Sequence, residues 1–159
     1  MIVGGGGFQK ANENTIEISG GNINNPSATN IYGRGNNETI NNTVTFTGWT
    51  VNANIYGGEN NTNITGNTLN IGTASKRVVG LSTNGIYNFE NINFYLPNTV
   101  NNGDIALSLK YNVDLSKSNI VVYLNNPLNL KQGDIVHIIK TNGTLNDPLS
   151  TSFNMVLLR

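Results

Sequence analysis

The only histidine in the sequence, His137, is the first residue to test for catalysis, because a Ser-His-Asp triad would have to use it as the base. A carboxylate, Asp134, lies three residues before it, but the segment 135–139 has the apolar pattern of a strand. The sequence contains no Gly-x-Ser-x-Gly nucleophile elbow. We therefore interpret His137 as an ordinary strand residue and predict that the chain has no catalytic residues and is not an enzyme.

Paired carboxylates are the second chemistry to test, since a glycosidase needs two of them beside the bond it cuts. The glutamates lie far apart in the sequence, at Glu13, Glu17, Glu38, Glu59 and Glu90. Only Glu17 lies in a strand-like phrase, and the matching positions of later phrases hold Thr45, Asn70 and Asn93. No row of acids forms from this pattern, so we predict that the glutamates are solvated turn residues.

Metal, cofactor and nucleic-acid sites need side chains that this composition lacks. The chain has no Cys and one His, so neither a thiolate site nor a His-rich metal site can be assembled. The glycines at 4–7 and 20–21 are followed neither by a helical pattern nor by Lys-Ser/Thr, as a phosphate loop requires. The 9 basic and 9 acidic residues cancel, which argues against nucleic-acid binding. We expect no metal, no cofactor and no nucleic-acid partner.

Three aromatic residues are the candidates for surface contact with a partner: Tyr32, Tyr56 and Trp49. Tyr32 and Tyr56 stand at equivalent places in two similar phrases and alternate with Ile31 and Ile55, so their rings are expected to point outward. Outward aromatic rings can anchor a protein or stack on a sugar. The alternative is that the rings stack on one another and only stiffen the structure, and the sequence leaves both readings open.

The elements that must position these residues follow a repeat of about 25 residues. One strand-like phrase occurs four times, beginning at Asn14, Asn42, Asn67 and Asn91. A second phrase alternates with it, at Ile2-Val3, Ile31-Tyr32, Ile55-Tyr56 and, in a weaker copy, Val78-Val79. Two interleaved phrases with one shared period indicate a solenoid, because a propeller blade would need four strands in ~40–45 residues.

Apolar and polar residues alternate within each phrase, which predicts strands with one buried face. Stacked in parallel, the phrases give two interior ladders, one of Ile16, Val44, Leu69 and Ile92 and the other of Ile18, Phe46, Ile71 and Phe94. The asparagines that open the phrase are expected to hydrogen-bond along the stack, as Asn ladders do in other parallel stacks. Such ladders account for much of the Asn content, which is 32 of 159 residues.

The sequence becomes more apolar after about residue 97, with strands expected at 105–109, 120–124 and 135–139. The segment Gly103-Asp104-Ile105 recurs as Gly133-Asp134-Ile135, one repeat later. We predict one domain in two parts, Gly/Asn-rich repeats over 1–97 and more apolar closing turns with a cap over 98–159. The predicted fold is an all-β right-handed parallel β-helix of about five or six turns of roughly 25 residues, a fragment of a longer protein.

The phrases at 54–58, Asn-Ile-Tyr-Gly-Gly, and at 42–48, Asn-Thr-Val-Thr-Phe-Thr-Gly, resemble the Gly/Asn-rich repeats of type V autotransporter passenger domains. The segment 128–139, with its Gly133-Asp134 pair, is similar to the Leu-x-x-Gly-Asp phrase that closes many passenger β-helices. The stretch from Val113 to Leu124 resembles the strand pair often found before it. The sequence contains neither a signal peptide nor a barrel, and the Gly-Asp-Ser-Gly phrase of protease passengers is absent.

The resemblance implies a passenger on the outer surface of a Gram-negative cell, attached through its own C-terminal β-barrel. On this basis we expect a non-catalytic, monomeric adhesin or rigid stalk for adhesion, aggregation or biofilm formation. Its partner would be a protein or glycan on a host or neighbouring cell. The alternatives are a β-helix carbohydrate-active enzyme, a secreted carbohydrate-binding solenoid, or a spacer whose recognition parts lie elsewhere.

Overall fold

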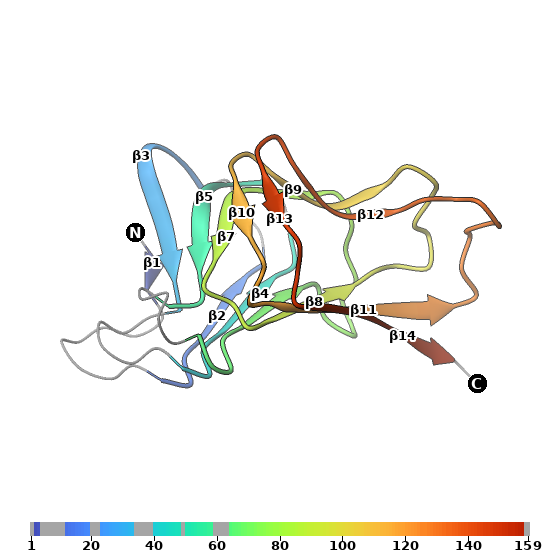
Figure 1. Cartoon of the computed structure of the whole chain (residues 1–159), viewed down its shortest axis with the longest axis horizontal. Helices are drawn as coiled ribbons and strands as arrows, with labels where there is room; N and C mark the ends of the chain where they lie inside the picture. The colour runs from blue at the N-terminus through green and yellow to red at the C-terminus, as the bar shows by residue number, and fades with distance from the viewer. Residues whose placement is uncertain are drawn as a thin grey trace.

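The computed structural model describes residues 2–3, 12–19, 23–33, 40–48, 50–58 and 64–157, and every regular element in these ranges is a β-strand (Figure 1). One six-stranded sheet, sheet A, consists of β1 (Ile2–Val3), β3 (Ile23–Tyr32), β5 (Thr50–Tyr56), β7 (Leu81–Tyr87), β9 (Ile105–Leu109) and β12 (His137–Thr141). The other, sheet B, consists of β2 (Thr15–Ile18), β4 (Thr43–Phe46), β6 (Thr68–Ile71), β8 (Asn91–Tyr95), β11 (Asn119–Asn126) and β14 (Ser150–Leu157).

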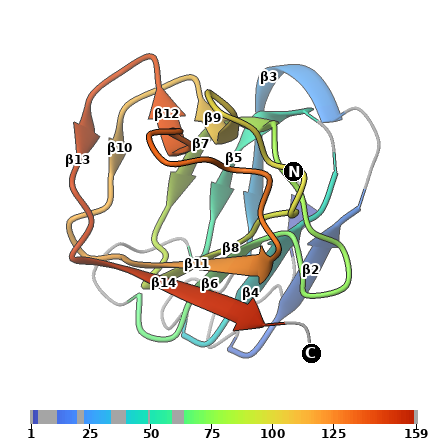
Figure 2. The same cartoon turned by 90° about the vertical axis from the view of Figure 1, so that its right-hand side faces the viewer.

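The chain alternates between the two sheets and therefore winds as a parallel β-solenoid, as Figure 2 shows from the C-terminal end. All pairings between neighbouring strands are parallel. The last two turns add a third side, where β10 (Val113–Asp114) pairs with β13 (Leu145–Asn146). The all-β parallel solenoid is confirmed, with about four complete turns rather than five or six.

The two predicted interior ladders are confirmed residue by residue. Ile16 pairs with Val44, Val44 with Leu69 and Leu69 with Ile92, and the second ladder follows the same register two residues later. Sheet B continues both ladders into the next turn with Ile120 and Val122. All of these side chains are buried, because parallel turns at the ~4.8 Å strand spacing place each apolar residue directly on its equivalent. These ladders form the core of the coil.

Two members of the predicted repeats are wrong. Asn91 pairs with Thr68 rather than Asn67, because this turn is one residue shorter than the spacing of the asparagines suggests, and Ile92 already lies opposite Leu69. In sheet A the fourth copy of the Ile-Tyr phrase is Ile86-Tyr87, which pairs with Ile55-Tyr56. Val78-Val79 lies outside the strands, in the connection between β6 and β7. The connections between strands differ in length, so equivalent residues do not recur at a constant spacing in the sequence.

The two Gly-Asp segments form matching turns. Asp104 Oδ2 accepts a hydrogen bond from the N–H of Asn101, and Asp134 Oδ2 accepts one from Lys131, both at 2.8 Å. Each turn passes through a glycine with positive φ, 85° at Gly103 and 95° at Gly133, where other residues would be strained. The Gly-Asp match predicts that Ile105 pairs with Ile135 in the strands that follow. In the structure Ile105 pairs with His137, two positions further along the chain. This shift by two keeps the same faces turned inward, since side chains alternate with period two.

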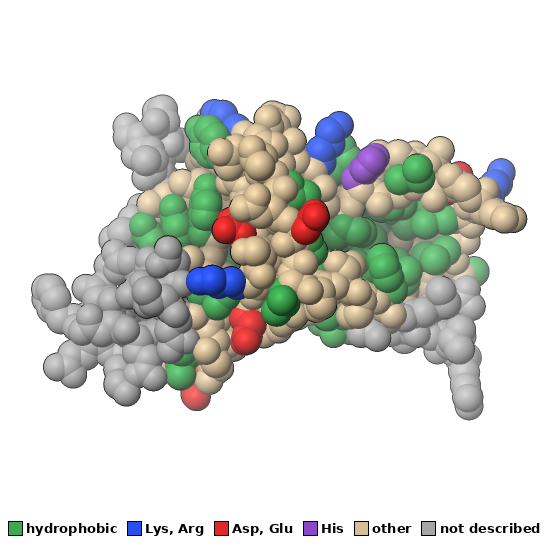
Figure 3. Space-filling view, viewed as in Figure 1, with side chains coloured by type: hydrophobic (Ala, Val, Ile, Leu, Met, Phe, Trp, Pro, Cys, Tyr) green, Lys and Arg blue, Asp and Glu red, His purple; other side chains and the backbone are tan. Residues whose placement is uncertain are grey.

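The predicted division at residue 97 stays a prediction, although strands from both parts belong to the same two sheets. At the C-terminal end the second interior ladder continues from Val122 to Phe153, whose side chain is 65% exposed. Leu149 and Ile135 of the same turn are also exposed, and hydrophobic side chains gather over this end in Figure 3. The last turn therefore leaves apolar ladder positions uncovered.

Candidate functional site

A column of tyrosine rings runs along the outside of sheet A, at the ends of three successive strands. Tyr32 stacks on Tyr56 and Tyr56 stacks on Tyr87, each with ring centroids 4.8 Å apart. The interplanar angles are 21° and 22°, so the rings lie nearly face to face. The predicted equivalence of Tyr32 and Tyr56 is confirmed by their register, and Tyr87 is the third member, which the sequence analysis missed. Trp49, the third predicted contact residue, lies outside the described residues.

Small residues two positions before each tyrosine hold the column in place. Asn30 Nδ2 donates a hydrogen bond to the Tyr32 hydroxyl at 2.8 Å, and Asn54 Nδ2 donates to Asn30 Oδ1 at 3.4 Å. Gly85 takes the corresponding position in β7. A Cβ atom there would stand 2.5 Å from the Tyr87 hydroxyl oxygen, so the Tyr87 ring occupies the space that the glycine leaves. Tyr32 and Tyr56 stack with asparagine at this position, so the glycine accommodates the Tyr87 ring alone.

Burial makes the hydroxyl groups of Tyr56 and Tyr87 less acidic. Burial raises the pKa of Tyr56 above its ordinary value of 10.0, and the neighbouring hydroxyls of Tyr32 and Tyr87 raise it further. Burial also raises the pKa of Tyr87, with an added contribution from Tyr111 in the next turn. Tyr56 and Tyr87 are therefore uncharged at neutral pH, and their hydroxyl groups act as neutral hydrogen-bonding groups.

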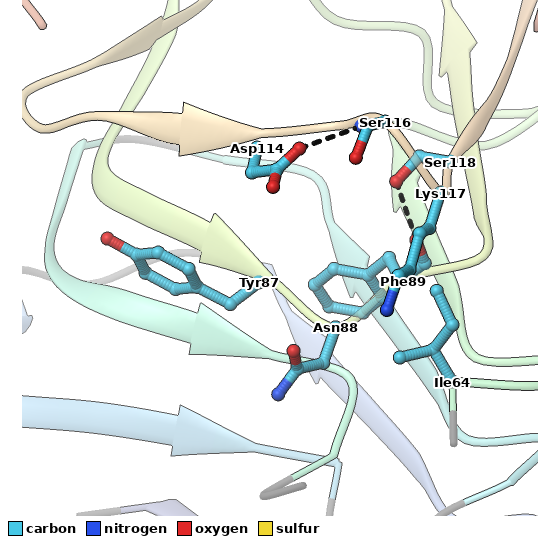
Figure 4. Close-up of a pocket in the computed structure, with 8 residues that line it drawn as sticks. All are labelled: Ile64, Tyr87, Asn88, Phe89, Asp114, Ser116, Lys117 and Ser118. Atoms are coloured by element: carbon cyan, nitrogen blue, oxygen red, sulfur yellow. Dashed lines mark hydrogen bonds between the residues drawn. The ribbon is translucent and has the colours of Figure 1, made fainter. Parts of the chain in front are cut away.

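A hollow of about 210 Å³ lies at the end of the column, beside Tyr87 (Figure 4). Tyr87 and Asn88 line it from the end of β7, while Asp114 and the residues after β10 line it from the facing side. Ile64 and the buried ring of Phe89 supply its apolar lining. The hollow therefore combines aromatic, apolar and charged groups, contributed by segments that lie far apart in the sequence.

The charged groups of this hollow are Asp114 and Lys117. Asp114 Oδ1 accepts a hydrogen bond from the Ser116 N–H at 3.0 Å, and this bond lowers the pKa of the carboxyl group below its ordinary 3.8. Lys117 interacts electrostatically with the same carboxylate and favours its charged form as well. Ser118 Oγ is engaged elsewhere, since it donates to the Phe89 carbonyl at 2.7 Å and fixes the turn against the residues after β7. Asp114 is thus a carboxylate at neutral pH, and Lys117 lines the same hollow.

None of the described residues first tested for catalysis lines this hollow. His137 is exposed at the start of β12, opposite Ile105. Glu17 is followed along sheet B by Thr45, Asn70 and Asn93, as predicted, so no row of acids forms there. Glu90 Oε2 accepts a hydrogen bond from the Gly66 N–H at 2.6 Å, and Glu13 is an exposed turn residue with positive φ. Glu38 and Glu59 lie outside the described residues.

Sequence reasoning missed Asn88, Asp114 and Lys117. Asp114 lies at the end of β10 and Lys117 in the turn after it. Neither residue belongs to a repeated phrase, so the repeat could not point to them. For Asn88 a signal existed, because it follows the Ile86-Tyr87 copy of the second phrase.

A second ring stack, of Tyr95 on Tyr123 at 4.5 Å, lies on sheet B. Arg77 braces that stack by donating to the Leu96 and Tyr123 carbonyls at 3.2 and 2.9 Å. Both rings belong to strands of sheet B, and neither lines the hollow.

Comparisons of the chain with protein-family models, with curated proteins and with solved structures found no match. Within the described ranges, no three His, Cys, Asp or Glu side chains gather as a possible metal site. The same part of the chain contains no helix with the length and hydropathy needed to cross a membrane. The fold and the local geometry are therefore the basis for any functional conclusion.

Proposed function

We propose that the chain is a non-catalytic, surface-exposed passenger segment of a type V autotransporter, which acts as an adhesive or rigid stalk. In this proposal it is displayed on the outer membrane of a Gram-negative bacterium through a C-terminal β-barrel. The partner is a protein or glycan on a host or neighbouring cell. The observation that carries the proposal is the continuous parallel coil, along whose outside the column of Tyr32, Tyr56 and Tyr87 runs.

The coil provides the mechanical part of this role. Each turn hydrogen-bonds to its neighbours along both sheets, and the two buried ladders run through the same turns without a break. A stack of this kind depends only on nearest neighbours and keeps side chains at fixed spacing along its length. These properties suit a rod that holds a binding surface away from a cell.

The carbohydrate-active enzyme is the weaker alternative. Glycoside hydrolysis ordinarily uses two carboxyl groups about 5–10 Å apart. Asp114 is the only acidic residue that lines the hollow beside Tyr87 within the described part of the chain. The hollow offers a binding surface more readily than a catalytic pair, which favours the secreted carbohydrate-binding solenoid among the alternatives.

The location and the adhesive role can be tested separately. Antibodies raised against the purified chain should label intact cells of the source bacterium, and external protease should remove the label. The gene should continue past Arg159 into alternating segments of ~10 residues typical of membrane strands. Label that appears only after cell lysis, or a gene that continues into a catalytic module, would overturn the passenger proposal.

Adhesion itself is tested with beads coated with the purified chain. Coated beads should bind host or sibling cells more than beads coated with a Tyr32→Ser/Tyr56→Ser double variant. Equal binding by both coatings would remove the column from the adhesive role. No binding by either coating would leave the stalk as the function of this segment.

A further inference from the structure

We propose that the hollow between Tyr87 and Asp114 binds one neutral sugar residue of a glycan. The inference rests on the proposed function for its biological meaning, since it names the ligand class of the surface at the end of the tyrosine column. The hollow itself is defined by the geometry of the turns that contain β7 and β10.

The hollow exists because the tyrosine column ends at Tyr87. In the described residues the ring-on-ring contacts of this column run from Tyr32 through Tyr56 to Tyr87. The next strand, β9, pairs with β7 only as far as Thr83, opposite Leu109. The N–H groups of Lys110 and Tyr111 then donate to the Asn84 carbonyl, and the chain departs into β10. The residues after β10 line the space beside Tyr87.

The position of Tyr87 differs from that of the other two rings. The faces of Tyr56 are covered by Tyr32 and Tyr87, so Tyr56 can offer only its edge and hydroxyl to a partner. Tyr87 is covered by Tyr56 on one face only in the described residues; it lines the hollow, and Tyr111 of the next turn lies near enough to act on its hydroxyl. An aromatic face next to polar groups is the surface on which the apolar face of a sugar ring packs.

The charged groups beside Tyr87 favour a neutral ligand. The Asp114 carboxylate accepts hydrogen bonds and the Lys117 ammonium donates them, and their charges cancel. A phosphate or carboxylate ligand would be repelled by Asp114, and a cation would be repelled by Lys117. A hydroxyl group both donates and accepts, so the hydroxyls of one sugar can hydrogen-bond with either side chain.

The size of the hollow limits the ligand to a small ring. Pockets for drug-sized ligands enclose ~300–1,000 Å³, and this hollow encloses about 210 Å³. Ile64 and Phe89 form its apolar lining, and Asn88, Asp114, Ser116 and Lys117 contribute polar groups. One sugar residue fits this description, and the rest of a glycan chain would extend over the outer surface of the coil.

The proposal can be tested by titrating the isotope-labelled chain with four neutral sugars: methyl glucoside, methyl galactoside, methyl mannoside and N-acetylglucosamine. Backbone amide signals are followed up to about 20 mM sugar, since a weak site has a millimolar Kd. We expect at least one sugar to shift the amides of residues 86–89 and 114–118 and to leave those of β12 unchanged. Inorganic phosphate, titrated in the same way, should shift neither group.

Two variants test the contacts, and one serves as the matched control. Asp114→Asn keeps the acceptor for the Ser116 N–H but loses the charge, and Tyr87→Leu removes the aromatic face. Asp114→Asn should weaken sugar binding by about tenfold, because a hydrogen bond to a charged group is roughly twice as strong as a neutral one. Tyr87→Leu should weaken it by about the same factor, because the sugar ring loses the aromatic face on which it packs. Asp147→Asn alters an exposed acid of the next turn and should leave binding unchanged.

The proposal is overturned if none of the four sugars shifts the 86–89 and 114–118 amides, if phosphate shifts them more, or if both variants bind as tightly as the parent chain. A spectrum that keeps its dispersed strand signals shows that each variant is folded. Sugar binding without adhesion of coated beads supports the site while the adhesive role fails. Adhesion that persists without any sugar binding supports the adhesive role and overturns the site.

Discussion

The Oδ1 atom of Asn67 accepts two hydrogen bonds from Asn42, one from its backbone N–H at 3.1 Å and one from its Nδ2 at 3.2 Å. Asn42 Oδ1 accepts the same pair from Asn14, at 3.1 and 2.9 Å. Asn42 and Asn67 are fully buried, so these side chains satisfy backbone and amide donors that water cannot reach. The ladder ends at Asn67, whose Nδ2 donates to the Asn88 carbonyl at 3.3 Å.

Replacing Asn67 with Ala should lower the free energy of unfolding by about 1–3 kcal/mol. The substitution removes the acceptor of both Asn42 hydrogen bonds and leaves buried donors unpaired. Urea unfolding followed by circular dichroism measures the change. Asn98→Ala, at an exposed turn, is the control and should change the free energy by less than about 0.5 kcal/mol. Equal effects of the two substitutions would show that the buried amides contribute nothing specific.

Replacing Phe46 with Ala should destabilise the chain more strongly, by about 3–5 kcal/mol. Phe46 is fully buried between Ile18 and Ile71 of the adjacent turns, so the truncated side chain leaves a cavity in the ladder. The milder Phe46→Leu variant gives a measurable value if the Ala variant does not fold. Glu17→Ala, on the outward face of the neighbouring strand, should have almost no effect on the urea midpoint.

Stability should fall as the pH rises above 10, because Tyr56 and Tyr87 have raised pKa values in the folded state. The unfolded chain ionises first, so above pH 10 it binds fewer protons than the folded chain and is favoured. Below pH 10 both states keep these protons, so the two tyrosines do not make the stability depend on pH there. Thermal unfolding at several alkaline pH values measures the loss. Tyr56→Phe should reduce the pH dependence, and an unchanged slope in this variant would contradict the role of the column.

Removing residues 104–159 should leave the Gly/Asn-rich turns unable to fold. The truncation deletes β9 and β11, and thereby uncovers Leu81 of β7 together with Ile92 and Phe94 of β8. Circular dichroism and limited proteolysis of the truncated chain measure the outcome. A product that stays fully β-structured and protease-resistant would show that the closing turns are not needed as a folding seed.

The exposed end of the second ladder should promote self-association. β12 and β14 are edge strands, and Phe153 and Leu149 beside them are 65% and 68% exposed. Phe153→Asp places a charge in the ladder position and should reduce association at high protein concentration, as measured by sedimentation velocity. Ser152→Asp adds the same charge on the adjacent position of β14, and a similar reduction there would assign the effect to net charge alone.

The sequence was sufficient for features that repeat and insufficient for features that occur once. Alternation placed Ile16, Val44, Leu69 and Ile92 in one ladder because side chains of parallel turns superpose whatever the connections do. The connections themselves vary, since the turn from Leu69 to Ile92 is markedly shorter than the turn from Ile55 to Ile86. This variation displaced Asn91 from the Asn ladder and hid Tyr87 from the aromatic column.

Only the repeated part of the candidate site could be predicted, for the same reason. Tyr32 and Tyr56 belong to a repeated phrase, and their equivalence could be predicted from it. Asp114 and Lys117 reach the hollow because the chain leaves the path of the earlier turns after Lys110. This departure from the repeat depends on how β10 packs in the folded chain and cannot be read from local spacing in the sequence.

Parallel pairing also has a mechanical consequence. The hydrogen bonds between turns point along the coil axis, so a pull on the end of β14 loads the β11–β14 ladder one bond after another. The coil therefore resists bending, because the bonds of both sheets act together, but it peels from a pulled end. Each turn that detaches would lengthen the chain by the residues of that turn. The gain in length is smaller for the turn from Leu69 to Ile92 than for the longer turn from Leu107 to Ile139. A tether built this way lengthens in steps under load and keeps its remaining turns intact.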